Sequence, residues 1–279
     1  METLISIFRE VRDPRDFNAQ HDLAAMLFIS LAATLCGAKS CVDIADFAAA
    51  NEATLAEIVD LDHGAPSHDS FSRVFRLLDP DEMAQAFARF VAAMREGLGL
   101  DPASGVVAID GKRLRRGYER GRACMPPLMV SVWDAEQTDS GHDRHEWQRA
   151  SVIARPADAP DFPGLSAIGR YETEREADGK VVKAVHYVAL SKRLSPQRLL
   201  EVTRRYWSVE NQCHWRLDVA FYEDDARTRK NYGPQNLAVL RRIALDILSA
   251  HPDKRSVGRK MKLAAWSKDF FFDLFAHLR

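Results

Sequence analysis

The hydrophobic period of this chain changes once, near residue 100, and that change constrains the fold more than any other feature. Before it, apolar residues recur at spacings of three and four, as they do from Leu23 to Thr34. After a Pro-containing joint at residues 101–104, short apolar runs separated by turn residues take over, which is typical of strands. The sequence therefore predicts an α+β fold, with a helical domain at residues 1–100 followed by a strand-containing domain.

Capping residues mark where the helices of the first domain begin. Asp22 is predicted to cap one helix, residues 42–58 are predicted to form a second, and Ser67 or Asp69 is predicted to cap a third. Asp79, followed by proline, should end the third helix and open a fourth. Short helices with tight connections suit either a helix-turn-helix-like DNA-binding module or a plain helical bundle, and the pattern does not choose between them.

The second domain carries five strand-like runs. They lie at residues 106–109, 127–133, 147–153, 167–173 and 181–190. Residues 138–145 are polar and irregular, and 176–180 has the composition of a hairpin turn. Pro196 fits the first position of a helix, and a helical pattern with breaks runs from there to about Leu248.

Composition sets the broad class of the protein. With 279 residues and 46% hydrophobic residues, the chain can bury a core, and its net charge of −1 gives no global sign of nucleic-acid binding. No apolar run reaches the length of a membrane span, and the first residues lack the pattern of a signal peptide. We therefore expect a cytoplasmic, bacterial protein without a membrane partner, whose four cysteines are reduced and buried.

Basic residues gather in two short segments despite the neutral total. Either segment alone is explained most simply as solvated surface, although a local basic patch can also contact phosphates. The first cluster is Lys112, Arg113, Arg115, Arg116, Arg120 and Arg122, and the second is Lys254, Arg255, Arg259, Lys260, Lys262 and Lys268.

Two acids stand in unusual surroundings. Asp110 ends the apolar run that begins at Val106, and Glu210 lies in a stretch rich in aromatic, amide and basic residues, 205–219. Phosphodiester chemistry with two metal ions needs carboxylates that converge from separate elements, and a strand end and a helix are suitable mounts. We therefore predict that Asp110 and Glu210 are catalytic residues and metal ligands. The predicted DNA contacts are Lys112, Arg113, Arg115, Arg116, Asn211, His214 and Trp215.

The residues around Glu210 allow a simpler interpretation as well. On one continuous helix, Trp207, Asn211, His214 and Asp218 would form a single stripe beside Glu210. Asn211 and His214 would then orient water or phosphate, and an exposed tryptophan would stack on a base. The alternative is that Trp207, Trp215 and His214 are ordinary core residues next to a surface glutamate, and composition alone slightly favours it.

Several motifs resemble the ISAs-type insertion-sequence transposases, relatives of the H-repeat-associated proteins. Those at the start of the chain are Asp13-Pro14-Arg15, Leu35-Cys36-Gly37-Ala38, Pro66-Ser67-His68-Asp69-Ser70-Phe71 and Arg73-Val74-Phe75. Ala108-Ile109-Asp110-Gly111-Lys112-Arg113-Leu114-Arg115 resembles the first catalytic motif. The last catalytic motif is resembled by Trp207-Ser208-Val209-Glu210-Asn211, His214-Trp215, Leu217-Asp218-Val219, Phe221 and Glu223-Asp224. The match is extended by Asn236-Leu237-Ala238 and Leu240-Arg241-Arg242-Ile243-Ala244.

The resemblance implies an RNase H-like catalytic domain with a β-rich insertion, using Asp, Asp and Glu with magnesium to cut and rejoin DNA at element ends. Asp110 corresponds to the first acid and Glu210 to the third. The motif of the second acid is absent, and the match breaks between about residues 136 and 141, which implies an internal deletion. Asp134, Asp139 and Asp143 lie nearby, but none precedes the expected helix, so we interpret them as solvated loop acids.

These expectations give a domain plan and three functional readings. The plan is a helical domain at 1–100, an incomplete RNase H-like domain at 105–250 and a basic C-terminal tail at 251–279. The first reading is a DDE-type transposase of double-stranded element ends whose catalysis is impaired by the missing aspartate and whose two-magnesium site is incomplete. The second is a non-catalytic fragment that binds DNA or oligomerises, either with copies of itself or in mixed oligomers with intact transposase. The third is a decaying product without a selected role.

Overall fold

The fold is described from a computed structural model of residues 1–99, 106–110, 129–133, 146–156, 164–177, 180–208 and 213–276. Within these ranges, only the backbone is described for residues 106–110, 129–133, 146–147, 175–177, 180 and 205–208. The chain forms two compact units, a helical one and a sheet-containing one.

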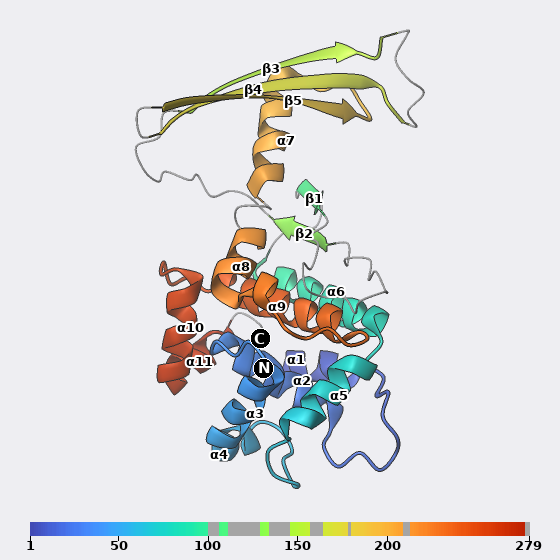
Figure 1. Ribbon diagram of the computed structural model, residues 1–279, viewed down its shortest axis with the longest axis vertical. Helices are drawn as coiled ribbons and strands as arrows, with labels where there is room; N and C mark the ends of the chain where they lie inside the picture. The colour runs from blue at the N-terminus through green and yellow to red at the C-terminus, as the bar shows by residue number, and fades with distance from the viewer. Residues whose placement is uncertain are drawn as a thin grey trace. The chain divides into compact units, whose positions relative to one another are not determined.

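The described residues contain helices, a two-stranded sheet and a three-stranded antiparallel sheet, which confirms the predicted α+β class (Figure 1). The helices are α1 (Glu2–Arg9), α2 (Leu23–Leu35), α3 (Cys41–Ala50), α4 (Glu52–Ala56), α5 (His68–Leu77), α6 (Pro80–Gly97), α7 (Pro196–Ser208), α8 (Trp215–Phe221), the 3-10 turn η2 (Glu223–Asp225), α9 (Gly233–Ala250), α10 (Val257–Trp266) and α11 (Lys268–Asp273). The strands are β1 (Val106–Asp110), β2 (Met129–Trp133), β3 (Glu146–Ala154), β4 (Ala167–Ala177) and β5 (Lys180–Leu190).

Helix α2 is the centre of the helical unit. It starts where predicted, because the Asp22 carboxylate accepts a hydrogen bond from the Ala25 amide at 2.8 Å. All thirteen of its residues are buried, so α2 is apolar all round rather than amphipathic. Its neighbours include α1, α3, α5, α9 and α10.

The single helix predicted for residues 42–58 is wrong, because two short helices, α3 and α4, occupy the segment. Asn51 separates them with φ −118° and ψ 17°, and its side-chain amide donates to the Phe47 oxygen at 2.9 Å. An asparagine side chain that bonds locally to the backbone competes with helix continuation. The predicted caps further on are confirmed, since Ser67 accepts from the Ser70 amide and Asp79 from the Asp81 amide.

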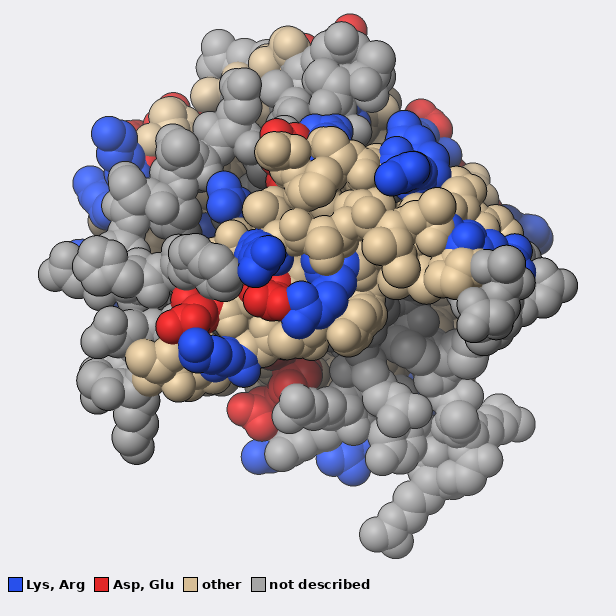
Figure 2. All heavy atoms as spheres, turned by 90° about the horizontal axis from the view of Figure 1, so that it is seen from above, with Lys and Arg blue, Asp and Glu red and all other residues tan. Residues whose placement is uncertain are grey.

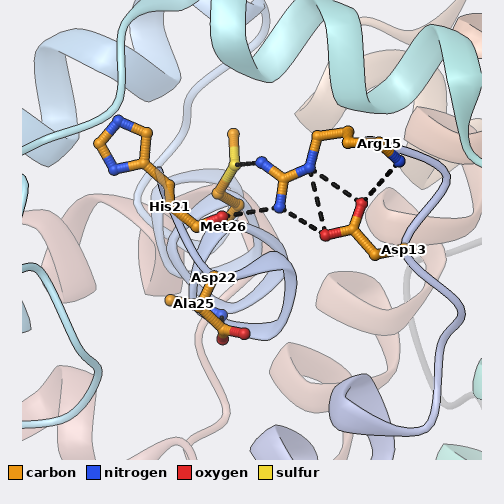
Figure 3. Close-up of polar contacts among 6 residues, drawn as sticks. All are labelled: Asp13, Arg15, His21, Asp22, Ala25 and Met26. Atoms are coloured by element: carbon orange, nitrogen blue, oxygen red, sulfur yellow. Dashed lines mark hydrogen bonds and ion pairs between the residues drawn. The ribbon is translucent and has the colours of Figure 1, made fainter. Parts of the chain in front are cut away.

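The Asp13-Pro14-Arg15 motif anchors the loop that leads into α2 (Figure 3). The Arg15 guanidinium bonds to the Asp13 carboxylate at 2.7 Å, donates to the His21 oxygen at 2.6 Å, and contacts the Met26 sulfur at 3.1 Å. Partial burial raises the pKa of Asp13, but the hydrogen bonds and charge of Arg15 outweigh it and hold that pKa below its ordinary value. The Asp13-Pro14-Arg15 motif therefore has a structural role, because its contacts fix the loop before α2.

Helix α9 packs on α2, α5 and α6, although more than 130 residues separate it from these helices in the chain. The Asn236 side chain is fully buried there and donates to the oxygens of Phe75 and Leu78 at 2.9 and 2.8 Å. The oxygens it caps lie at the end of α5, where helical carbonyls lack partners within the helix. The N-terminal helices and the C-terminal helices therefore form one unit, with α10 and α11 packed into it.

The sheet-containing unit has the strand order β3-β4-β5, with both pairs antiparallel. The hairpin predicted around residues 176–180 is confirmed, because β4 ends at Ala177 and β5 begins at Lys180. Helix α7 starts at Pro196, as predicted, and packs on β3 and β4 with Leu199 buried against Gly169. The glycine leaves the room that this leucine fills.

The sheet face opposite α7 stays open among the described residues, and Figure 2 views it from above. By register, Ile153, Val185 and Tyr187 share this face with Arg170 and Glu172. Val185 is 48% and Tyr187 70% exposed, and the charged neighbours Arg170 and Glu172 form an ion pair. Apolar and charged groups therefore alternate across this face.

Candidate functional site

Asp110 is the last residue of β1, a strand that pairs with β2 in a two-stranded sheet. The backbone therefore carries Asp110 at a strand end, where the sequence placed it. Its side chain and the whole of Glu210 lie outside the described residues, so their pairing as catalytic acids stays a prediction. The same holds for the predicted DNA contacts Lys112, Arg113, Arg115, Arg116 and Asn211, and for the loop acids Asp134, Asp139 and Asp143.

The backbone changes its helical form just before α8. Helix α7 ends at Ser208 and α8 begins at Trp215, with Cys213 and His214 in a wider π-helical turn. The stripe predicted for Trp207, Asn211, His214 and Asp218 assumed regular α-helical spacing, and the π turn departs from that spacing. Turns of this kind occur frequently at functional sites.

His214 and Trp215 are adjacent in sequence but differ in exposure. The His214 side chain is buried, at 9% exposure, whereas Trp215 is 60% exposed at the first position of α8. The interpretation of Trp215 as a core residue is therefore wrong, and its ring is open to a ligand on the described surface. The residues of α8 that are buried are Leu217 and Phe221, which face the rest of the helical unit.

A buried ion pair holds the segment after α8. Glu223 lies in η2, where Tyr222 adopts the left-handed conformation with φ 54°, and the Glu223 carboxylate is 3.2 Å from Nη1 of Arg242 on α9. Arg241 follows at 4.0 Å. Burial lowers the pKa of Arg241, and the charge of Glu223 opposes that shift. Two motifs of the resemblance, at 223–224 and 240–244, are thus joined by the ion pair between Glu223 and Arg242.

A cation–π contact adds a second tie to this segment. The Lys39 ammonium lies 3.5 Å from the centre of the Tyr222 ring, which joins the α2–α3 connection to the residue that precedes η2.

Sequence reasoning missed the roles of Asn236, Glu223, Arg242 and Tyr222. Asn236, Glu223 and Arg242 belong to the motifs of the resemblance and Tyr222 to none, and a motif does not distinguish a scaffold residue from a catalytic one.

The described residues contain no group of three or more His, Cys, Asp or Glu side chains that could hold a metal ion. The two predicted acids add one carboxylate from a strand end and one from the segment before α8. Two-metal centres need carboxylates that bridge and flank both ions. Asp110 and Glu210 alone would leave that donor set incomplete, and this stays a prediction because their side chains lie outside the described part of the chain.

Known proteins resemble this chain at its start and along its whole length. Residues 5–91 match the DDE_Tnp_1-associated family. The putative protein YbfL and the H repeat-associated putative transposase YhhI, both from Escherichia coli K12, are each 22% identical over 370 residues, covering 98% of this chain and 96% of theirs. An uncharacterized protein from the dhlA 3' region of Xanthobacter autotrophicus is 36% identical over 132 residues, 46% of this chain and 43% of its own. No solved structure matches the chain.

These matches confirm the predicted resemblance to insertion-sequence transposases. The H repeat-associated putative transposases are among the relatives, and the matching family model covers the N-terminal part of the chain. The two long alignments extend over 370 positions and the chain has 279 residues, so at least 91 aligned positions have no residue here. That difference is consistent with the inferred internal deletion. In the described part of the chain, every helix is too short or too polar to cross a membrane.

Proposed function

We propose that this chain is a DDE-type insertion-sequence transposase by descent, with DNA cleavage and strand transfer impaired by loss of the second aspartate. The observation that carries the proposal is a donor set reduced to Asp110, at the end of β1, and Glu210, in a chain at least 91 positions shorter than its alignments with full-length relatives. In this proposal β1 and β2 belong to an incomplete RNase H-like domain. The proposal also includes magnesium as the metal cofactor, the double-stranded ends of the element as the DNA partner and the cytoplasm as the location of the protein.

The chemical argument concerns charge and positioning. Magnesium is usually held by one or two carboxylates together with waters and substrate phosphates, so two acids suffice for one ion but do not complete a two-metal centre. In-line transfer also needs the reacting atoms held close to one geometry, and small misplacements cost large factors in rate. Strand cleavage and joining should therefore be absent or very slow in this chain.

The alternative role is a non-catalytic DNA-binding or oligomerising fragment that modulates an intact transposase. It is favoured by the helical unit, in which contacts such as Asn236 with Leu78 and Glu223 with Arg242 close the packing without the absent segment. Such a unit keeps its surface for DNA or for other copies whether or not the catalytic domain works. As a homo-oligomer, or mixed with intact enzyme, it would lower transposition.

A strand-transfer assay with the element's ends and magnesium tests the proposed impairment, and DNA retention by the same chains tests the alternative role. We expect no product above that of an Asp110→Ala, Glu210→Ala double variant, together with DNA retention that this variant preserves. Clear product that the double variant loses would overturn the proposed impairment. Rapid proteolysis and no DNA retention at low salt would instead indicate a decaying product without function.

A further inference from the structure

Helix α10 presents an exposed stripe of basic and aromatic side chains. Arg259, Lys262 and Trp266 follow one another at spacings of three and four, so they lie on the same side of the helix. All three are exposed, and Trp266 is 77% exposed, the highest value for a tryptophan among the described residues. An indole left this open on a helix forgoes about 150–250 Å² of burial, which a partner would supply.

The opposite side of α10 is fully used by the fold. Val257, Met261 and Ala264 are buried, and α10 packs on α2, α8, α9 and α11. Lys260 is buried too, and its ammonium donates to the oxygens of Leu248 and His251 at 2.7 and 2.9 Å. One cation of the basic segment therefore caps the end of α9, and the others remain for an external anion.

The basic stripe continues past the start of the helix. Lys254, Arg255, Ser256 and Arg259 line a shallow, open depression together with Asp253. Asp253 is the one acid there, and it is engaged by the backbone amide of Arg255 at 2.8 Å and by its guanidinium at 3.4 Å. From Lys254 to Lys268 the chain has six cations and no acid, so the local field is positive.

We propose that this surface, Lys254, Arg255, Arg259, Lys262 and Trp266, binds DNA, with the cations on the phosphates and the indole on an exposed base. Arg259 to Trp266 covers roughly 10 Å along the axis of α10, at 1.5 Å per residue. A DNA duplex carries one negative charge per about 1.7 Å of its axis, so several phosphates come within reach of that span. Tryptophan stacks on bases of any sequence, which suits contact at a strand end or overhang.

The stripe fits DNA better than a membrane surface. Helices that lie in a lipid interface bury a continuous apolar face, and the apolar side chains of α10 are already buried within the protein. Trp266 is the one large apolar group on the stripe. The proposed surface also uses none of the predicted catalytic residues, Asp110 and Glu210.

The test measures how the full chain binds a labelled duplex of unrelated sequence, with and without a single-stranded overhang, as salt is varied. We expect an Arg259→Gln, Lys262→Gln variant to bind several-fold more weakly, with a log affinity against log salt slope shallower by about two. The matched control is Arg9→Gln, Arg12→Gln, which removes two exposed cations from α1 and the residues after it, in the same unit. This control should bind as the unchanged chain does.

Trp266 is tested on the overhang. Trp266→Ala should weaken binding of the overhang duplex about tenfold and of the blunt duplex much less, while Trp266→Phe should keep most of the affinity. Equal binding by the α10 variants and the control would overturn the proposal. Binding to phosphatidylserine vesicles serves as a second measurement. Variants that bind these vesicles more weakly but bind both duplexes as the unchanged chain does would also overturn the proposal. Because Asp110 and Glu210 are intact in every variant, these outcomes are independent of strand transfer and of the proposed impairment.

Discussion

The side-chain amide of Asn236 donates a 2.8 Å hydrogen bond to the backbone oxygen of Leu78, 158 residues earlier in the chain. With its second bond, to Phe75, it ties α9 to the end of α5 inside a fully buried site. The N-terminal segment that matches the DDE_Tnp_1-associated family, residues 5–91, is thereby completed by a helix from the far end of the chain. A loss of residues between these two parts leaves this contact in place.

Asn236→Leu is expected to destabilise the helical unit by about 2–4 kcal/mol, because the change leaves two buried carbonyl oxygens without donors. Urea unfolding followed by circular dichroism measures the loss. Asn51→Ala is the matched control, since Asn51 makes one local bond to Phe47 at a less buried position and its loss should cost about 1 kcal/mol. Equal losses in the two variants would contradict the bridging role.

The Glu223–Arg242 pair predicts strong coupling between η2 and α9. Glu223→Leu or Arg242→Met alone should cost about 3–5 kcal/mol, because the first removes the carboxylate from two buried guanidiniums and the second removes the closer guanidinium from the buried carboxylate. The double variant should cost clearly less than the sum of the two, since it removes both charges. A double-mutant cycle by urea unfolding checks this, and additive losses would argue against a buried ion pair.

Local signals in the sequence predicted the helix starts well and the long-range pairing not at all. The cap at Asp22, the turn between β4 and β5, and Pro196 at the start of α7 each depend on a few neighbouring residues, and each is confirmed. Asn51 broke a predicted helix because its side chain bonds back to the backbone. No pattern along the chain announces that α9 packs on α2 and α5, because that contact depends on shape and burial across the fold.

The sequence predicted which residue types belong to the candidate site, but it predicted their exposure and backbone conformation only in part. The sequence placed Asp110 at a strand end, and β1 does end there. It offered two interpretations for Trp215 and His214, and the structure separates them, with the indole exposed and the imidazole buried. The π turn at Cys213 and His214 could not be foreseen, because one extra residue per turn leaves no trace in hydrophobic spacing.

Asp246 gives the helical unit a specific pH dependence. Burial raises the pKa of this half-buried carboxyl on α9 to about 7 from its ordinary value of 3.8, against the opposing charge of Arg242. The folded state therefore holds the proton more tightly than the unfolded state does. Its contribution to stability is full below about pH 4 and is lost as the pH rises through about 7.

Asp246→Asn should therefore stabilise the protein at pH 8, by up to about 4 kcal/mol, and change little at pH 4, where the folded chains both carry a neutral side chain. The difference in unfolding free energy between variant and unchanged chain, measured across this range, isolates the one group. Asp46→Asn, at an exposed position of α3, is the control and should give a flat difference. A variant advantage that is constant with pH would rule out titration of Asp246.

Gly169 tests the packing of α7 on the sheet. A methyl group added there would lie 2.7 Å from Cδ2 of Leu199 and 2.8 Å from Cγ2 of Val188, and the branched valine cannot turn away easily. Gly169→Ala should therefore cost about 1–3 kcal/mol through overpacking. The control is Gly258→Ala in α10, where no atom lies within 4 Å of the new methyl group, so the change should be neutral or stabilise by up to about 1 kcal/mol. Hydrogen exchange of the β4 amides locates the effect, and protection unchanged by Gly169→Ala would mean that α7 does not pack on β4 as described.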